Sequence, residues 1–244
     1  MSATQGSLTC RGYRRADHSP AMILASASIV KTSWRWLTLG LLLVQGCQAL
    51  PPTALAKQHY FRGDQAFSAG RLEEAIAAYQ RALQADPNLP GVRTNLGNAL
   101  VSSGQGDQAI VQYQEALRLT PTDSYARANL ASAYTERGEL DLAIAEYQEA
   151  LRLAPNLVLA HAGLGFLYAD RGKLDPAITH YQEAARLAPD RPIIIHALAA
   201  LLEQADRLAD ALAQWERYLQ LVPNAPDRRE AEWHIRHLRK SLKR

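Results

Sequence analysis

The residues able to do chemistry in this 244-residue chain are few and poorly grouped for catalysis. Its two cysteines, Cys10 and Cys47, both precede residue 50, so the rest of the sequence has no thiol for a disulfide, a zinc site or a nucleophile. His234 and His237 lie one helical turn apart, but no third ligand accompanies them, which argues against a metal site. The sequence also holds no phosphate loop, G-x-S-x-G or H-E-x-x-H motif. We therefore expect neither an enzyme nor a cofactor.

The charged residues divide unevenly along the chain. Residues 56–225 carry 20 Asp and Glu against 15 Lys and Arg, whereas residues 226–244 carry 7 basic residues against 3 acidic ones. A surface that binds nucleic acid needs clustered Lys and Arg, because these displace the counterions of the phosphates. The acidic centre argues against a nucleic-acid partner. Apolar residues make up 48% of the whole chain, which predicts a packed core.

Residues 1–47 have the pattern of a leader. Lys31 and Arg35 precede an uncharged apolar run over residues 36–44, which is well short of the roughly 18 to 20 residues that cross a membrane as a helix. Basic residues followed by a short apolar run are typical of a secretion signal. Because Met1 lies too far upstream for such a signal, Met22 is the better candidate for the true start.

The end of the apolar run offers a site of attachment. Val44-Gln45-Gly46-Cys47 resembles the lipobox of bacterial lipoproteins, although Gln45 replaces the usual small residue. The resemblance implies lipid attachment at Cys47, a linker over residues 48–55 and a location in the cell envelope, membrane-anchored or periplasmic. Cleavage after Ala49 or Ala56 stays open, as does a cytoplasmic chain with an uncleaved leader.

The elements that position any binding residue are set by a repeat. Prolines stand at positions 87, 121, 155, 189 and 223, each 34 residues after the last, and such a period is typical of a solenoid. Alignment on these prolines gives five units: 56–89, 90–123, 124–157, 158–191 and 192–225.

Each unit predicts two amphipathic helices joined by a turn. In residues 124–157, Ala126, Leu130 and Tyr134 share one face at helical spacing, and Ala143 and Tyr147 share another. Unit position 15 is Gly in four units and Asp206 in the fifth, where a helix must stop. The large residues at unit position 24 lie on the apolar face and are expected to be core: Tyr79, Tyr113, Tyr147, Tyr181 and Trp215.

These features resemble the tetratricopeptide repeat (TPR) family. The match is best in His161-x2-Leu164-Gly165-x2-Tyr168, followed by Ala177-x3-Tyr181 and Pro189. The resemblance implies an all-α protein: a right-handed α-solenoid of five TPR units, with residues 226–244 as a basic amphipathic capping helix. The family's Trp at unit position 4 is absent and is replaced by His59, Arg93, Arg127, His161 and Ile195.

The same resemblance implies that the first helix of each unit lines a concave groove. A pair of Asn side chains on successive units, Asn95 and Asn129, offers donors and acceptors to the backbone of an extended peptide. Phe61 and Tyr125 stand where a carboxylate clamp needs other residues, which argues against capture of a C-terminal carboxylate. The partner-binding residues expected from this comparison are Lys57, Asn95, Asn98, Tyr125, Asn129 and Phe166.

The last two units and the tail leave alternatives open. Leu159, Phe166 and Ile193 make the corresponding wall apolar, so a partner helix, a second copy of the chain or the tail is expected to cover it. Residues 226–244 are expected to cap the solenoid, and contact with anionic lipid or an acidic partner is the alternative.

Taken together, the sequence predicts a non-enzymatic scaffold. It would be exported, anchored by a lipid, and would hold a partner peptide or helix in its groove to assist assembly of a complex. In layout it resembles bacterial TPR lipoproteins such as those that assist type IV pilus assembly. The alternative is a soluble cytosolic or thylakoid-associated assembly factor of the same fold.

Overall fold

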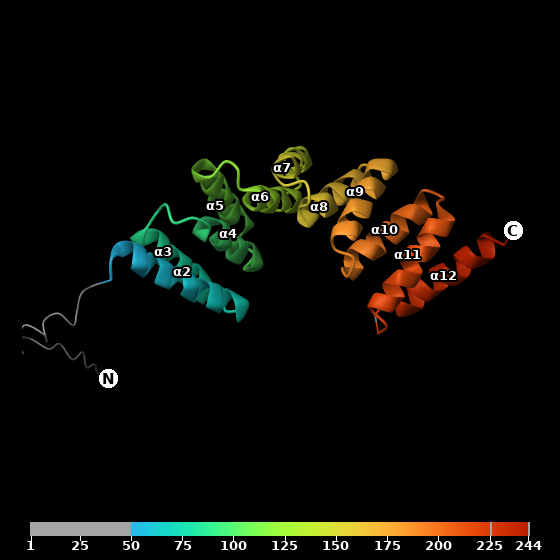
Figure 1. The fold of residues 1–244 in the computed structure, drawn as a ribbon, viewed down its shortest axis with the longest axis horizontal. Coiled ribbons are helices and arrows are strands. Elements are labelled where there is room, and N and C mark those ends of the chain that lie inside the picture. The colour runs from blue at the N-terminus through green and yellow to red at the C-terminus, as the bar shows by residue number, and fades with distance from the viewer. Residues whose placement is uncertain (1–49, 225, 244) are drawn as a thin grey trace, which may run out of the picture. The chain divides into compact units, whose positions relative to one another are not determined.

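The structure, a computed structural model, describes residues 50–224 and 226–243, and these residues form eleven helices and no strand (Figure 1). The chain therefore has the all-α fold that its repeat predicts. In order, the helices are α2 (Pro52–Ser68), α3 (Leu72–Ala85), α4 (Val92–Ser102), α5 (Gly106–Leu119), α6 (Ser124–Glu136), α7 (Leu140–Leu153), α8 (Val158–Asp170), α9 (Leu174–Leu187), α10 (Pro192–Gln204), α11 (Leu208–Leu221) and α12 (Arg228–Ser241).

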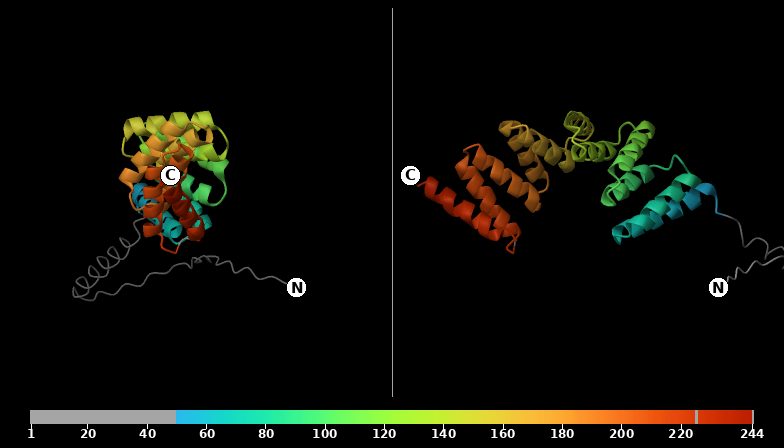
Figure 2. Two further views of the ribbon diagram at one scale, coloured as in Figure 1. Left: turned by 90° about the vertical axis from the view of Figure 1, so that its right-hand side faces the viewer. Right: turned by 180° about the vertical axis from the view of Figure 1, so that it is seen from behind.

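The helices pair into five hairpins that stack in chain order. α2 packs on α3, α4 on α5, α6 on α7, α8 on α9 and α10 on α11, and the second helix of each hairpin packs on the first helix of the next. First helices of neighbouring hairpins also touch, as α2–α4, α4–α6 and α6–α8. The first helices therefore form the inner surface of the stack. From behind, the same order runs from α2 to α12, which packs on α11 at the far end (Figure 2).

The turn inside each hairpin is closed by a residue with positive φ. Gly70, Gly104, Gly138 and Gly172 have φ between 69° and 78°, and Asp206 has φ 55°. In the first hairpin, the N–H of Arg71 donates to the carbonyl of Ala66 and the N–H of Gly70 to the carbonyl of Phe67, and the other hairpins repeat both bonds. This is the Schellman geometry that glycine favours after a helix.

The first helix begins earlier than the unit boundary suggests. α2 starts at Pro52, so residues 52–55, which the sequence analysis assigned to a linker, are helical. Proline is tolerated in the first turn of a helix because its missing N–H would have no partner there. The adjoining Ala54 and Leu55 then continue the helix into the first unit.

The core is built from the positions that repeat. The residues at unit position 24 are buried, and each is accompanied by a fully buried Ala four residues earlier, which confirms the predicted core. Leu at unit position 7 of the second to fifth units is buried as well. Adjacent hairpins share these apolar faces, so each hairpin depends on its neighbours for burial. The alanines are Ala75, Ala109, Ala143, Ala177 and Ala211.

Candidate partner-binding surface

The six residues predicted to bind a partner all lie on first helices, along the inner surface. They differ in burial: three of the side chains are exposed, Tyr125 to 65%, and the other three, all asparagines, are half-buried. The exposed residues are Lys57 on α2, Tyr125 on α6 and Phe166 on α8. The half-buried residues are Asn95 and Asn98 on α4 and Asn129 on α6.

The first and second hairpins are joined by a polar cluster around one carboxylate. Asp64 Oδ1 on α2 accepts hydrogen bonds from Tyr79 Oη at 2.8 Å and from Asn95 Nδ2 at 3.0 Å. Asn95 Nδ2 also donates to Tyr60 Oη at 3.0 Å. Burial, reinforced by the bond to Asp64, raises the pKa of the Tyr79 phenol, which therefore stays protonated and able to donate.

The second and third hairpins repeat this arrangement with an amide in place of the carboxylate. Asn98 Oδ1 accepts from Tyr113 Oη at 2.7 Å and from Asn129 Nδ2 at 2.8 Å. Burial raises the pKa of Tyr113 in the same way. In both junctions, the residue at unit position 9 accepts two hydrogen bonds. One comes from the Tyr at unit position 24 of the same unit, and the other from the Asn at unit position 6 of the next unit. We call these two clusters the polar ladder; its residues are Asp64, Tyr79, Asn95, Asn98, Tyr113 and Asn129.

The hydrogen bonds of the polar ladder hold each Asn side chain in place and leave one polar atom of each amide available to a ligand. Asn95 Oδ1, Asn129 Oδ1 and Asn98 Nδ2 have no hydrogen bond to any other described residue. A cleft of 210 Å³ between α4 and α6 is lined by Asn98, Tyr113 and Asn129 together with Ser132. Fixed amide donors and acceptors of this kind match the N–H and C=O groups of an extended peptide.

The ladder stops at the third hairpin, where the tyrosine changes place. Tyr79, Tyr113 and Tyr181 each lie over a glycine at unit position 8 of their own unit, as Tyr113 does over Gly97. The third unit has Ala131 at that position, and the ring of Tyr147 lies against Gly163 of the next unit instead. A Cβ on Gly163 would come within 2.3 Å of Tyr147 Cζ, so Gly163 occupies the place that Asn95 and Asn129 have elsewhere.

Beyond this point the inner surface is apolar. Ile193 on α10 is 77% exposed, and Phe166 and Leu159 on α8 are exposed as well. The neighbouring inner positions carry Gly163 and Ala197 rather than amides. The inner surface therefore has a polar half over α2, α4 and α6, where Phe61 and Tyr125 are also exposed, and an apolar half over α8 and α10. We call the exposed residues Leu159, Phe166 and Ile193 the apolar wall.

The residue at unit position 4, where the family pattern has Trp, joins the two helices of its own hairpin and the proline turn before it, and sequence reasoning missed this link. Arg127 Nη1 bonds to Glu146 Oε2 at 2.8 Å, and its Nη2 donates to the carbonyl of Pro121 at 3.0 Å. Arg93 contacts Gln112 and the Pro87 carbonyl in the same way. The signal available in the sequence was the paired change at unit positions 4 and 23, which is Arg with Gln, then Arg with Glu.

The fourth unit makes the same link with two histidines. His161 Nε2 lies 2.9 Å from the Pro155 carbonyl, and His161 Nδ1 lies 3.1 Å from His180 Nδ1. Because a carbonyl only accepts, His161 Nε2 carries a proton, and the neutral form of the ring then accepts from His180 at Nδ1. Burial, and then the nearby His161, lowers the pKa of His180.

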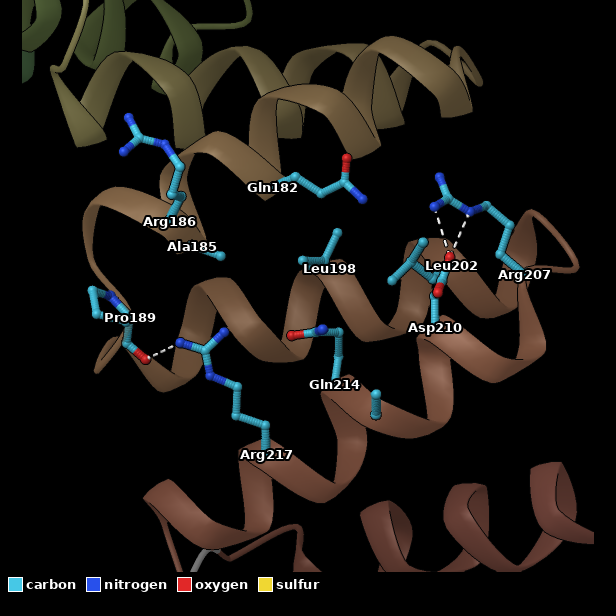
Figure 3. A pocket seen from close by; sticks show the side chains of 11 residues that line it. Gln182, Ala185, Arg186, Pro189, Leu198, Leu202, Arg207, Asp210, Gln214 and Arg217 are labelled. Carbon is cyan, nitrogen blue, oxygen red and sulfur yellow. Dashed lines mark hydrogen bonds and ion pairs between the residues drawn. The ribbon is translucent and has the colours of Figure 1, made fainter.

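The fifth unit breaks the link, and a pocket opens there. Ile195 occupies unit position 4, and Gln214 at unit position 23 has a buried Oε1 without a hydrogen-bond partner among the described residues. Gln214 points into a pocket of 410 Å³ between α9, α10 and α11 (Figure 3). The three arginines at its edge are engaged: Arg186 with Glu183, Arg207 with Asp210, and Arg217 with the Pro189 carbonyl. The described residues that line this pocket therefore offer no free cation to an anionic ligand.

Two further observations bear on chemistry. Over residues 50–224 and 226–243, no group of three or more His, Cys, Asp or Glu is placed to hold a metal ion. Within the same ranges, no helix has the length and apolarity of a membrane span. Cys47 and the rest of the leader lie outside the described residues, so their predicted roles stay predictions.

Five stacked helical hairpins with an inner surface of first helices define a helical-repeat protein. Comparison with known families narrows this class to one family. Sequence models of the family match residues 63–104 (TPR repeat), 94–158 and 158–191 (both tetratricopeptide repeat). The chain belongs to the tetratricopeptide repeat family, which serves generally as a non-catalytic protein-interaction module.

Solved structures agree on the fold. TTC0263, a thermophilic TPR protein of Thermus thermophilus, is 27% identical, with 74% of this chain and 98% of that one covered and a TM-score of 0.60. MamA is 26% identical over 65% of this chain and 93% of its own, with a TM-score of 0.57. PilF of Pseudomonas aeruginosa is 18% identical over 79% and 92%, with a TM-score of 0.65. The search of curated proteins found no match.

Proposed function

We propose that this TPR protein is an exported scaffold, lipid-anchored at Cys47, that holds an extended segment of a partner against its inner surface and assists assembly of a larger complex. The observation that carries the proposal is the polar ladder. It holds Asn95, Asn98 and Asn129 in place while leaving amide groups free beside a cleft. Fixed groups lose little entropy when a peptide binds, which favours binding.

The two halves of the inner surface suit two parts of one partner. The polar half pairs with peptide backbone, and the apolar wall takes an apolar helix that follows it. A second copy of this chain is the competing occupant of the apolar wall. Native mass measured over a range of protein concentrations separates the two, because only self-association gives a dimer that Ile193→Asp abolishes.

A crosslinking pull-down tests the groove. The double variant Asn95→Ala, Asn129→Ala should lose partners that the parent recovers, because it removes the free amide oxygens. The matched control is Gln80→Ala, Gln108→Ala, which removes two exposed amides from the second helices α3 and α5. Circular dichroism must show equal helix content in all three proteins. Recovery of the same partners by both double variants would contradict the assignment of the groove.

The anchor has a test of its own. The leader pattern at Lys31, Arg35 and Val44–Cys47 supports export and lipidation. Intact mass of the native protein should show a chain that begins at Cys47 and carries a diacyl group. An intact leader would instead support the alternative, a soluble cytosolic or thylakoid-associated assembly factor with the same groove.

A further inference from the structure

The outer face of the last helix, α12, carries a stripe that capping does not explain. Its buried face consists of Ala231, Ile235 and Leu238, which pack against α11. A second series of residues, with spacings of 4, 3, 4 and 3, is shifted by two residues from the buried series. A shift of two residues places it on the opposite side of the helix. All its members are exposed: Arg229, Trp233, Arg236 and Lys240 on α12, and Lys243 just after its end. We call these five residues and the adjoining His237 the outer stripe.

The cations of the outer stripe are largely unpaired. Within residues 50–224 and 226–243, Arg229, Lys240 and Lys243 form no ion pair, and Arg236 reaches Glu232 only at 3.9 Å. The acids of α12, Glu230 and Glu232, lie on its flanks rather than on the stripe. The second helices of the repeats differ, because α5, α7 and α9 each pair their last-turn Arg with a Glu three residues earlier.

An aromatic residue stands among these cations. Trp233 is 53% exposed, and its ring stacks on His237 with centroids 5.3 Å apart and planes 7° apart. A capping helix needs only a polar outer face, and an exposed indole adds nothing to that role. Trp beside Lys and Arg is the pattern of side chains that lie at the headgroup level of a membrane.

We propose that the outer stripe of α12 binds the surface of an anionic phospholipid membrane. From Arg229 to Lys240 the stripe spans about 17 Å along one side of the helix, so its cations can meet several headgroups of a flat surface at once. Because the apolar face of α12 stays packed on α11, contact is peripheral: the cations pair with lipid phosphates and Trp233 enters the headgroup layer. This site is separate from the inner surface and does not depend on the lipid proposed at Cys47.

Vesicle binding by residues 48–244 tests the site, because this part is a compact unit of its own and lacks the apolar run, Trp34, Trp36 and Cys47 of the leader. Vesicles of phosphatidylcholine alone are compared with vesicles containing about 30% phosphatidylglycerol at an ionic strength of about 0.1 M. We expect the anionic vesicles to bind more strongly, and the triple variant Arg229→Gln, Arg236→Gln, Lys240→Gln to lose roughly 100-fold of that binding. Trp233→Phe should remove the additional fluorescence quenching that brominated lipids cause only in anionic vesicles.

A charge-matched control separates the stripe from net charge. Arg62→Gln, Arg81→Gln, Lys173→Gln removes three exposed cations from the repeats, and it should bind anionic vesicles like the parent. Equal losses in the two triple variants would overturn the proposal. So would equal binding of the parent to neutral and anionic vesicles, or stripe-dependent binding to DNA or polyglutamate with none to vesicles. Loss of partners in the pull-down is independent of all these results.

Discussion

The tyrosine at unit position 24 shows how one residue changes its neighbours. Where unit position 8 is glycine, as at Gly97, the ring fits over that glycine within its own hairpin. Where it is Ala131, the ring of Tyr147 lies against Gly163 of the next hairpin. Ala131 and Gly163 are therefore a matched pair: the first blocks one place for the ring, and the second opens another.

This pairing predicts a non-additive double variant. Gly163→Ala should lower the free energy of unfolding by about 1–3 kcal/mol, because the new Cβ collides with a packed ring. Ala131→Gly should cost about 1 kcal/mol through helix propensity. Together they should cost less than their sum, since Tyr147 can move into the space that Ala131→Gly opens. Urea unfolding of the four proteins measures the coupling, and simple additivity would contradict the pairing.

The sequence supported part of this picture at the residue level. That Tyr147 is core followed from helical spacing alone, because burial on one face needs no knowledge of the neighbouring unit. Its contact with Gly163 did not follow, because it depends on how α6, α7 and α8 approach one another. The same holds for Asp64, which the sequence analysis did not single out and which joins Tyr79 to Asn95.

At the scale of helices, the link between unit positions 4 and 23 closes the second, third and fourth hairpins on the proline turn before each of them. Arg93, Arg127 and His161 all reach the carbonyl of the proline six residues earlier. A proline carbonyl that no helix uses still needs a donor, and different side chains supply it. The sequence alone identified the prolines as helix stops. The donors to their carbonyls could be identified only from the geometry of the turn.

The histidine form of this link predicts a dependence on pH. His180 faces His161 and stacks on Tyr168, and its pKa is lowered by burial and by His161. Below the ordinary pKa of about 6.5, the unfolded chain takes up a proton that folded His180 resists. Stability from this site is therefore full above about pH 6.5 and declines as the pH falls towards the folded pKa.

Chemical unfolding at several pH values tests this link. Between about pH 7.5 and pH 5, the parent should lose more stability than His180→Gln, by less than about 1 kcal/mol because the ring is partly solvated. The Gln variant reproduces the residue that the second unit has at this position, Gln112. His237→Gln is the matched control, since that ring is exposed, and it should follow the parent. Parallel pH profiles for the parent and His180→Gln would exclude the effect.

Over the whole stack, the polar ladder is confined to the first three hairpins. The junctions between the first three hairpins contain the polar ladder, whereas the last hairpins and α12 share one extended apolar cluster. The ring of Trp215 stacks on that of His234 of α12 with centroids 4.6 Å apart, and Tyr218 Oη donates a hydrogen bond to Asp227 Oδ1 at 2.7 Å. Burial and that bond raise the pKa of Tyr218 to about 12. The C-terminal end therefore depends on α12.

Removal of residues 226–244 should destabilise the stack from one end. It exposes Trp215 and Tyr218 and loses the burial of Ile235 and Leu238, which together stabilise by roughly 3–5 kcal/mol. Because hairpins interact only with neighbours, hydrogen exchange should rise most in α10 and α11 and least in α4 and α5. Trp233→Ala, in the same helix but exposed, should leave exchange unchanged. A uniform rise along the stack would contradict this account.

The pairing of Ala131 with Gly163 also limits how this array can grow by tandem duplication. A second copy of residues 90–123 inserted after the first would place Asn98 beside another Asn95 and leave Gly97 beneath Tyr113, so the new joint would match the old one. A second copy of residues 124–157 would bring Asn129, rather than Gly163, against the ring of Tyr147. The third unit therefore cannot follow itself, and its place in the order is fixed by a single glycine in its successor.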